Sequence, residues 1–332
     1  MTAAVLLALS SGSQSLESLS NVLSGVSRED LEVRISGLRK SGFVDEEVVP
    51  DADLDKRESV SPDFVGWREA LHYVNATWDY PFVDYSRGGQ RVDRKRMKAY
   101  EGEADDVVRS LPVRGEWTCD LPSVEQALKE LGEPTAKLSL LQLLKNVTAA
   151  ATRPLEYMPS RTNGAPHLHR LAPSGGARHP IELYLLVIDV EGIAPGVYHS
   201  NISSGDLRRI CKLPPVEELE RNLYGAWRLG CKPRAIFLLT AHVMRNMYRY
   251  REPRTFRTLF YDAGHMGGLI EALANDSAIV AHGHHGFVDS YAATLTQSQS
   301  LAKEVPTYLV SVGIRAELEP GTKMIGRSRL KL

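Results

Sequence analysis

Short apolar runs in the second half of the chain predict a buried β-sheet. Runs rich in Leu, Ile and Val that are bounded by turn residues are typical of strands inside a core. They occur at residues 182–190, 196–199, 235–241, 278–281 and 307–313. Apolar residues at helical spacing predict helices over 138–151 and 258–275. Helices and strands therefore mix, and we expect an α+β domain with a mixed sheet flanked by helices.

The first 65 residues follow a different pattern, with helices predicted at 3–9, 15–23 and 27–41 and separated by Ser/Gly turns. In the third, Leu31, Ile35 and Leu38 repeat at helical spacing, and Phe43 begins an extended piece. Three helices followed by a strand are typical of a winged helix. One hypothesis is DNA binding through Arg28, Arg34, Arg39 and Lys40. Because acidic neighbours offset these bases, docking of a peptide or a partner subunit is the preferred interpretation.

Residues 66–110 connect the two parts. Aromatic residues are concentrated between Trp67 and Tyr85, and such clusters usually pack helices onto a neighbouring domain. Residues 86–105 are strongly charged, which predicts a solvated helix face or, alternatively, a clamp for an anion. The resulting division is a winged-helix-like domain at 1–65, connecting helices at 66–110 and a C-terminal domain at 111–332.

Composition narrows the classes of function. With 40 basic and 41 acidic residues, the net charge of −1 creates no overall field that would attract nucleic acid or an anionic membrane. Three widely spaced cysteines support neither a disulfide framework nor a zinc site, and they favour a reducing cytoplasm. The apolar start lacks the positive charge of a secretory signal, and no stretch approaches the roughly 18 apolar residues of a spanning helix. We expect a soluble cytoplasmic protein.

A glycine-rich turn just before the strand at 182–190 is the first candidate site. It reads Ala-Pro-Ser-Gly-Gly-Ala-Arg-His-Pro over residues 172–180. Ser174 beside Gly175 and Gly176 lets backbone N–H groups approach an oxygen-rich ligand, and Arg178 adds a charged fork. The spacing is neither that of a P-loop nor that of a dinucleotide-binding turn. From these residues alone, an ordinary turn and an anion-binding loop both remain open.

A second candidate site precedes the helix predicted at 258–275. Residues 247–257 contain four arginines and two tyrosines. Guanidinium groups are suitable donors for an anionic group, and a phenol can transfer a proton. An exposed surface for a partner protein is the alternative interpretation.

Both segments resemble motifs of the SagB-type dehydrogenases, flavin enzymes on the nitroreductase fold. The glycine-rich turn is similar to their Pro-Ser-Gly-Gly-Ala-Arg-His-Pro segment, and Tyr250, Arg254 and the Asp-Ala-Gly-His run at 262–265 match a second block. This sequence departs from the family in two ways. Arg249 stands where the family has a lysine, and a guanidinium is a poor base. The Arg-Arg-Ser-x-Arg run that commonly holds flavin is missing, and only Arg114 lies in that region.

The resemblance covers residues 110–332 and implies a nitroreductase-like homodimer with FMN between the subunits. The implied reaction oxidises thiazoline or oxazoline rings in a ribosomally made precursor peptide to thiazole or oxazole, alongside cyclodehydratase partner subunits of the YcaO type. Tyr250 would handle the proton and Arg249 would act electrostatically. Flavin contacts would come from Ser174, Gly175, Gly176, Arg178, Arg254 and His265, with Arg327 and Arg329 as phosphate ligands after the last strand.

Two other functions remain open. One is an NAD(P)H-dependent flavin reductase of nitroaromatics or quinones on the same fold. The other is a non-catalytic scaffold that binds a peptide or a partner subunit, and both departures from the family favour it. Rapid bleaching of the flavin by NADPH would identify the reductase, whereas a colourless purified protein would identify the scaffold.

Histidines and carboxylates give weaker signals. The His-Gly-His-His run at 282–285 and the His-Leu-His run at 167–169 lack i, i+4 spacing and have no completing carboxylate or cysteine pattern, so no metal site is expected. Asp262 and Glu182 are a candidate acid and base pair. The alternative role for Asp262 is capping of the helix that follows.

Overall fold

In the computed structural model the chain forms two compact units, Met1–His72 and Tyr73–Leu332. The structure describes residues 16–23, 26–40, 70, 73–74, 76–78, 87–103, 111, 113–133, 137–158, 167–247, 250–298 and 303–318. No helix in these ranges is both long enough and apolar enough to span a membrane.

The first unit contains two helices in its described part, α2 (Leu16–Val22) and α3 (Arg28–Lys40). Of the three residues that repeat at helical spacing in α3, Leu31 and Leu38 are buried and Ile35 is half-buried; Leu19 of α2 is buried too. The Ser27 hydroxyl accepts a hydrogen bond from the Asp30 amide at 3.1 Å, which caps the start of α3. The first predicted helix, the end of the third and the extended piece at Phe43 lie outside the described residues. The winged helix therefore stays a prediction.

The second unit is built on a seven-stranded sheet in the order β1-β6-β5-β4-β7-β9-β8. The strands are β1 (Glu116–Asp120), β4 (Ile181–Val187), β5 (Gly196–Asn201), β6 (Asp206–Cys211), β7 (Ala235–His242), β8 (Ile279–His284) and β9 (Glu304–Ile314). Every pairing in this sheet is antiparallel. The expectation of a mixed sheet was therefore wrong, because short connections join β4, β5 and β6 as hairpins, and hairpins pair strands antiparallel. A separate small sheet pairs β2 (Glu156–Met158) with β3 (His167–His169).

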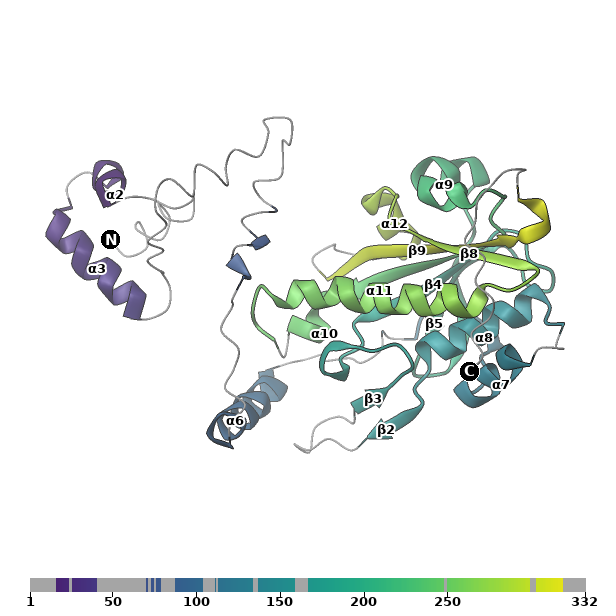
Figure 1. The fold of residues 1–332 in the computed structure, drawn as a ribbon, viewed down its shortest axis with the longest axis horizontal. Helices are drawn as coiled ribbons and strands as arrows, with labels where there is room; N and C mark the ends of the chain where they lie inside the picture. Colours follow the sequence, from purple (N-terminus) through teal and green to yellow (C-terminus); the bar gives the residue numbers. More distant parts are fainter. Residues whose placement is uncertain are drawn as a thin grey trace. The chain divides into compact units, whose positions relative to one another are not determined.

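Helices cover both faces of the large sheet (Figure 1). They are α7 (Val124–Gly132), α8 (Leu140–Thr152), α9 (Val216–Asn222), α10 (Val243–Met247), α11 (Thr255–Ala274) and α12 (Asp289–Leu295). Successive side chains of β4 point to opposite faces of the sheet and so contribute to two hydrophobic cores. Leu183 and Leu185 pack in the core beneath α8 and α11. Tyr184 and Leu186 pack in the core beneath α9 and α12. This arrangement confirms the α+β class.

All five predicted strands and both predicted helices of this unit overlap observed elements. Two strands of the large sheet were missed. β6 carries Asp206, Arg208 and Arg209, and β1 exposes Glu116 and Trp117, so neither presents the apolar run on which the prediction relied. Both lie at one edge of the sheet, where polar residues can face solvent.

The charged segment before this domain forms α6 (Arg87–Glu103). Met97 is its buried residue, and the guanidinium of Arg251 lies 3.8 Å from the centre of the Tyr100 ring. Ahead of α6, the Tyr73 hydroxyl donates a hydrogen bond to the Pro253 carbonyl at 3.2 Å. Both connecting segments therefore contact residues 251–253, which follow Tyr250 directly.

Candidate functional site

The glycine loop, residues 174–178, makes a tight turn that leads into β4. Its centre is the single 3-10 turn η1 (Gly175–Ala177). Three backbone positions have left-handed φ values: Gly176 at 62°, Ala177 at 52° and His179 at 48°. Glycine adopts this region freely, but Ala177 and His179 do so at a conformational cost, so surrounding contacts must hold the loop in place.

Asp262, on α11, provides those contacts. One of its carboxylate oxygens accepts a hydrogen bond from the Ser174 hydroxyl at 2.6 Å, and the other accepts one from the Gly175 amide at 3.2 Å. The Ser174 oxygen in turn accepts a hydrogen bond from the His179 amide at 2.8 Å. The side chain is buried, and burial raises the pKa of Asp262 even though these bonds act in the opposite direction. The glycine loop thus already binds one carboxylate, that of Asp262.

Tyr250 lies against the other side of the glycine loop. A methyl group added at Gly176 would overlap the Tyr250 hydroxyl, so the phenol and the glycine are in direct contact. The Tyr250 amide donates to the Asn246 carbonyl at 2.9 Å, and the Thr255 hydroxyl donates to the Tyr250 carbonyl at 2.9 Å. Two motifs that are far apart in the sequence, the glycine loop and the block from Tyr250 to His265, therefore meet at one point.

The remaining predicted site residues have different surroundings. Arg178 ends the 3-10 turn, and its backbone N–H donates to the Gly175 carbonyl at 3.4 Å. Arg254 precedes α11 and donates a hydrogen bond to the Thr77 carbonyl at 3.2 Å. His265 is exposed on α11. Arg249, Arg327 and Arg329 lie outside the described residues.

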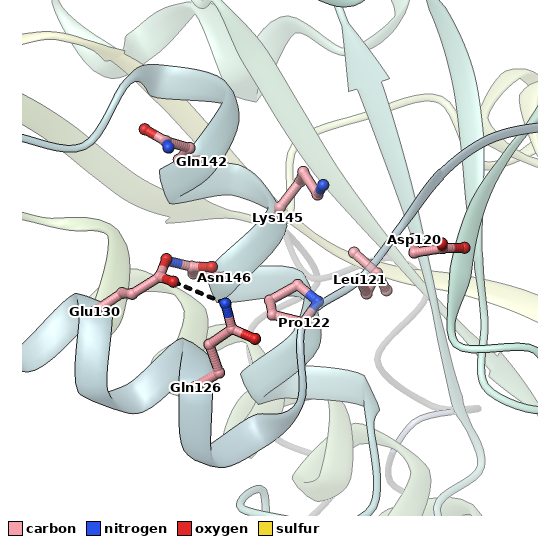
Figure 2. Close-up of a pocket in the computed structure, with 8 residues that line it drawn as sticks. All are labelled: Asp120, Leu121, Pro122, Gln126, Glu130, Gln142, Lys145 and Asn146. Atoms are coloured by element: carbon pink, nitrogen blue, oxygen red, sulfur yellow. Dashed lines mark hydrogen bonds between the residues drawn. The ribbon is translucent and has the colours of Figure 1, made fainter.

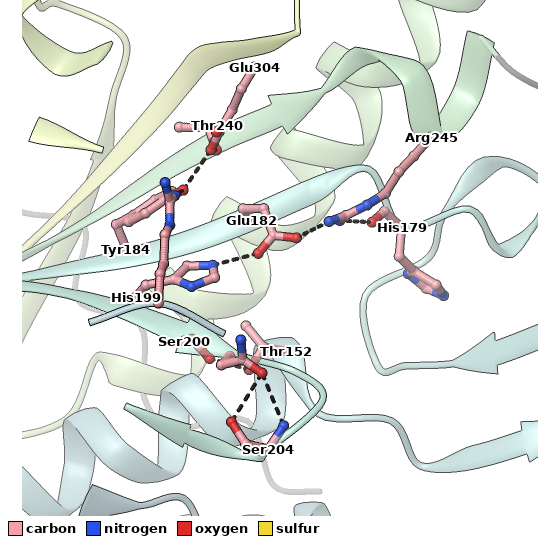
Figure 3. Close-up of polar contacts among 12 residues, drawn as sticks. Thr152, His179, Glu182, Tyr184, His199, Ser200, Ser204, Thr240, Arg245 and Glu304 are labelled. Carbon is pink, nitrogen blue, oxygen red and sulfur yellow. Dashed lines mark hydrogen bonds and ion pairs between the residues drawn. The ribbon is translucent and has the colours of Figure 1, made fainter. Parts of the chain in front are cut away.

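A buried ionic cluster lies directly beyond the glycine loop (Figure 3). Glu182 forms an ion pair with Arg245 and a 2.7 Å hydrogen bond with the ring of His199. Burial alone would raise the pKa of Glu182, but the charge of Arg245 and the bond with His199 outweigh it and lower that pKa to about 2. Arg245 also donates a hydrogen bond to the His179 carbonyl at 3.1 Å. The cluster therefore anchors the C-terminal end of the loop.

The same face of the sheet carries a second buried network (Figure 3). The Tyr184 hydroxyl and the Thr240 hydroxyl each donate a 2.7 Å hydrogen bond to one oxygen of Glu304. Arg114 donates to the Tyr184 hydroxyl. The ring of His199 lies 4.8 Å from that of Tyr184, which joins the two networks. Arg114, the basic residue singled out before the glycine loop, is thus part of a polar core.

Two interpretations of carboxylates from the sequence were wrong. Asp262 and Glu182 do not pair with each other, because Asp262 binds the glycine loop whereas Glu182 binds Arg245 and His199. Asp262 does not cap α11 either, since that helix begins at Thr255 and Asp262 lies in its interior. The buried network around Glu182 was not predicted from the sequence. Its available signal was a charged residue inside an otherwise apolar strand, since an isolated charge in a core requires partners.

Arg170, four residues before Ser174, is a buried cation. Its side chain is 7% exposed, and none of its three guanidinium nitrogens forms a hydrogen bond with a described residue. Burial and the nearby charge of Arg245 lower the pKa of Arg170 to about 10, which still leaves it charged at neutral pH. Burying an unpaired charge is costly. This orphaned guanidinium beside the glycine loop fits a site for an anionic cofactor.

The histidine runs hold no cluster of metal ligands in the described part of the chain, where no three His, Cys, Asp or Glu side chains converge. The rings of His282 and His284 stack edge to face at 4.9 Å. Burial and the adjacent His282 lower the pKa of His284 to about 4. His282 faces Glu271 at 3.4 Å.

A polar hollow with a volume of about 290 Å³ lies between α7 and α8 (Figure 2). Its lining residues are Asp120, Leu121, Pro122, Gln126, Glu130, Gln142, Lys145 and Asn146. Glu130 accepts hydrogen bonds from Gln126 at 3.0 Å and from Asn146 at 2.8 Å, so its carboxylate is already satisfied. None of the lining residues belongs to the glycine loop or to α11. The hollow is therefore separate from the site at Tyr250.

No family model matches the chain. The trifolitoxin-processing protein TfxB of Rhizobium leguminosarum bv. trifolii is 29% identical over 286 residues, which cover 76% of this chain and 72% of that protein.

Two solved structures are also similar. One, from Anabaena variabilis and designated a nitroreductase, has a TM-score of 0.53 and 18% identity, over 73% of this chain and 52% of the other. The present chain thus corresponds to about half of that one. The other is a chain of the E. coli microcin synthetase McbBCD complex, with a TM-score of 0.40 and 18% identity, over 91% of this chain and 98% of the other. This chain therefore has the fold of the Anabaena variabilis protein and is similar in sequence to TfxB.

Proposed function

We propose that this protein is an FMN-dependent oxidoreductase of peptide maturation, which converts thiazoline or oxazoline rings in a precursor peptide to thiazole or oxazole. The observation that carries the proposal is the contact between the Tyr250 hydroxyl and Gly176 in a loop that Asp262 holds rigid. General acid–base catalysis requires the proton-transferring group to be held in a fixed position, and the immobilised glycine loop provides a rigid surface against which the Tyr250 hydroxyl rests. The relationship to a trifolitoxin-processing protein supports a peptide substrate.

The cofactor site would be formed by the outer surface of the glycine loop and its cations. Ser174 and Gly175 direct their donors towards Asp262, so their contribution is to shape the loop. Gly176 and Arg178 would contact the cofactor, and Arg170 would supply the buried positive charge that an anionic group needs. FMN, when bound, supplies a two-electron acceptor that takes a hydride from the ring carbon.

Tyr250 would handle the proton that leaves the neighbouring ring atom. Loss of one hydride and one proton accounts for both hydrogens removed when an azoline becomes an azole. Two backbone hydrogen bonds fix the position of Tyr250, one to Asn246 and one from Thr255. Its hydroxyl is therefore held at the glycine loop. Arg249 next to it would contribute positive charge, as the family resemblance implies.

The first experiment is an absorption spectrum of the purified protein, followed by turnover of an azoline-containing peptide. We expect flavin bands, and we expect Tyr250→Phe to retain them while losing most turnover. Tyr224→Phe is the matched control, because Tyr224 is an exposed phenol shortly after α9 and lies outside both the proposed site and the proposed dimer interface. Unchanged turnover in Tyr250→Phe would remove Tyr250 from the mechanism. A colourless protein that still binds peptide would instead identify a scaffold, which the inward-facing donors of Ser174 and Gly175 favour.

We further propose a homodimer formed through α11, with cyclodehydratase subunits as additional partners. Phe256, Phe260 and Tyr261 are exposed on this helix, and an added methyl group at Gly264 or Gly268 would meet no neighbouring atom. Exposed aromatic residues beside open glycine positions are suited to close packing by a second helix. Light scattering should give twice the chain mass, and Phe260→Glu should shift it to the monomer. A monomeric wild type would refute this interface.

A further inference from the structure

Helix α6 presents a continuous basic face to solvent. Arg91, Arg94, Lys95 and Lys98 are all exposed. Their spacing of three, four and seven residues places them on one side of the helix. The buried Met97 and the Tyr100 ring, on which Arg251 stacks, lie towards the other side. The four cations therefore point away from the contacts that attach the helix.

This face is unfavourable for the isolated helix. Arg91 with Lys95, and Arg94 with Lys98, are like charges four residues apart, and such pairs destabilise a helix. Within the described residues, none of these four side chains has an ion pair or a hydrogen bond with a carboxylate. The chain as a whole has a net charge of −1, so the concentration of positive charge is local. An anionic partner would relieve the repulsion.

The basic face is connected to the candidate site. The Arg251 guanidinium lies 3.8 Å from the centre of the Tyr100 ring of α6, and Arg251 follows Tyr250 in the chain. A ligand on α6 would thus lie on the element that packs beside the proposed proton-handling residue. A peptide is long enough to occupy both places, whereas a small anion is not.

We infer that the α6 face docks an acidic stretch of the peptide substrate, an inference that rests on the proposed function. The charge suits carboxylates, and an extended peptide can follow the two turns that the four cations cover. Four cations are fewer than the six to ten or so phosphate contacts typical of strong nucleic-acid binding. An amphipathic membrane helix needs an exposed apolar face, but Met97 and Tyr100 are directed into the protein.

The test measures binding of fluorescein-labelled synthetic peptides to the full-length protein by anisotropy. One peptide carries four glutamates, and its partner has glutamine at the same positions. We expect the glutamate peptide to bind more tightly and to weaken as salt rises. The double variant Arg94→Glu/Lys98→Glu should weaken binding of the glutamate peptide about tenfold. The effect stays this modest because each exposed ion pair contributes little to the binding free energy. Arg96→Glu is the matched control, because Arg96 is exposed on the same helix but off this face, and it should leave the affinity within about twofold.

Equal affinities of the glutamate and glutamine peptides would overturn the inference. So would equal losses of affinity in Arg94→Glu/Lys98→Glu and in the control Arg96→Glu. So would tighter binding of a DNA oligonucleotide or of phosphatidylserine vesicles with the same dependence on Arg94 and Lys98. Circular dichroism checks that the helix is retained, and Arg94→Gln/Lys98→Gln provides a milder second variant. This assay needs neither flavin nor turnover. A protein that binds the glutamate peptide but shows no oxidation would therefore refute the proposed function and leave the docking surface intact.

Discussion

The contact between Asp262 and the glycine loop should be a major source of stability for the second unit. Replacing Asp262 with alanine leaves the Ser174 hydroxyl and the Gly175 amide without their acceptor. Both groups are held in a turn whose left-handed residues cannot rearrange freely. The change therefore removes a restraint on the loop as well as two hydrogen bonds.

The magnitude follows from the geometry of the two bonds. A hydrogen bond to a charged group contributes about 1.5–3 kcal/mol to the free energy of unfolding. The 2.6 Å bond from Ser174 has the usual length of a strong bond from a hydroxyl to a carboxylate, whereas the 3.2 Å bond from Gly175 is long and its contribution lies at the lower limit. Burial of the carboxylate opposes both, as the raised pKa of Asp262 indicates. We expect Asp262→Ala to lose about 2–3 kcal/mol.

Urea denaturation of a double-mutant cycle measures the contact directly. Its members are the wild type, Ser174→Ala, Asp262→Ala and the double variant, and the expected coupling energy is about 1–2 kcal/mol. Asp289→Ala, which removes an exposed carboxylate, is the control and should change stability by less than about 0.5 kcal/mol. Additive single effects would show that Ser174 and Asp262 act independently. The reasoning about the loop would then fail.

Three further changes test the same region. Gly176→Ala should lower the free energy of unfolding by about 1–2 kcal/mol, because alanine is strained at a left-handed φ and its methyl group would overlap the Tyr250 hydroxyl. The loss should be smaller in a Tyr250→Phe background, and equal losses in both backgrounds would contradict the contact. Burial, with help from the charge of Arg170, lowers the pKa of His179 to about 3, so the folded state resists a proton that the unfolded chain accepts near pH 6.5. Stability should therefore fall by about 2 kcal/mol between pH 7 and pH 5, and urea denaturation of His179→Asn should show a smaller fall. Arg170→Met should stabilise the flavin-free protein by about 1–3 kcal/mol in thermal unfolding and weaken flavin binding in titration; a less stable variant would show that the cation is already compensated.

The strands and the long helices were predictable because local patterns determine them. β4 and β7 are buried along almost their whole length, so their residues form apolar runs. β1 and β6 form an edge and carry charged residues, so only pairing with neighbours identifies them as strands. The antiparallel order could not be read from the sequence either, since it depends on which strands become neighbours in the folded sheet.

The candidate site was predictable in part. The glycine loop and the block around Tyr250 were singled out from their residue types, and the structure brings Gly176 and Tyr250 together. That the Ser174 hydroxyl points into the protein was not predictable, because its direction depends on where α11 places Asp262. The partners of Glu182 were hidden for the same reason, since His199 comes from the neighbouring strand β5 and Arg245 from α10.

The balance of buried charge explains why the loop can use an internal anion and still suit an anionic cofactor. The two buried carboxylates nearest the loop are both committed, Asp262 to the loop itself and Glu182 to Arg245 and His199. Glu182 interacts with Arg170 through its charge alone, and no described residue forms a hydrogen bond with the Arg170 guanidinium. A ligand that brings its own negative charge would gain the interaction that the fold leaves unmade. Under the proposed function, Arg170 would supply positive charge to that ligand from the N-terminal side of the glycine loop.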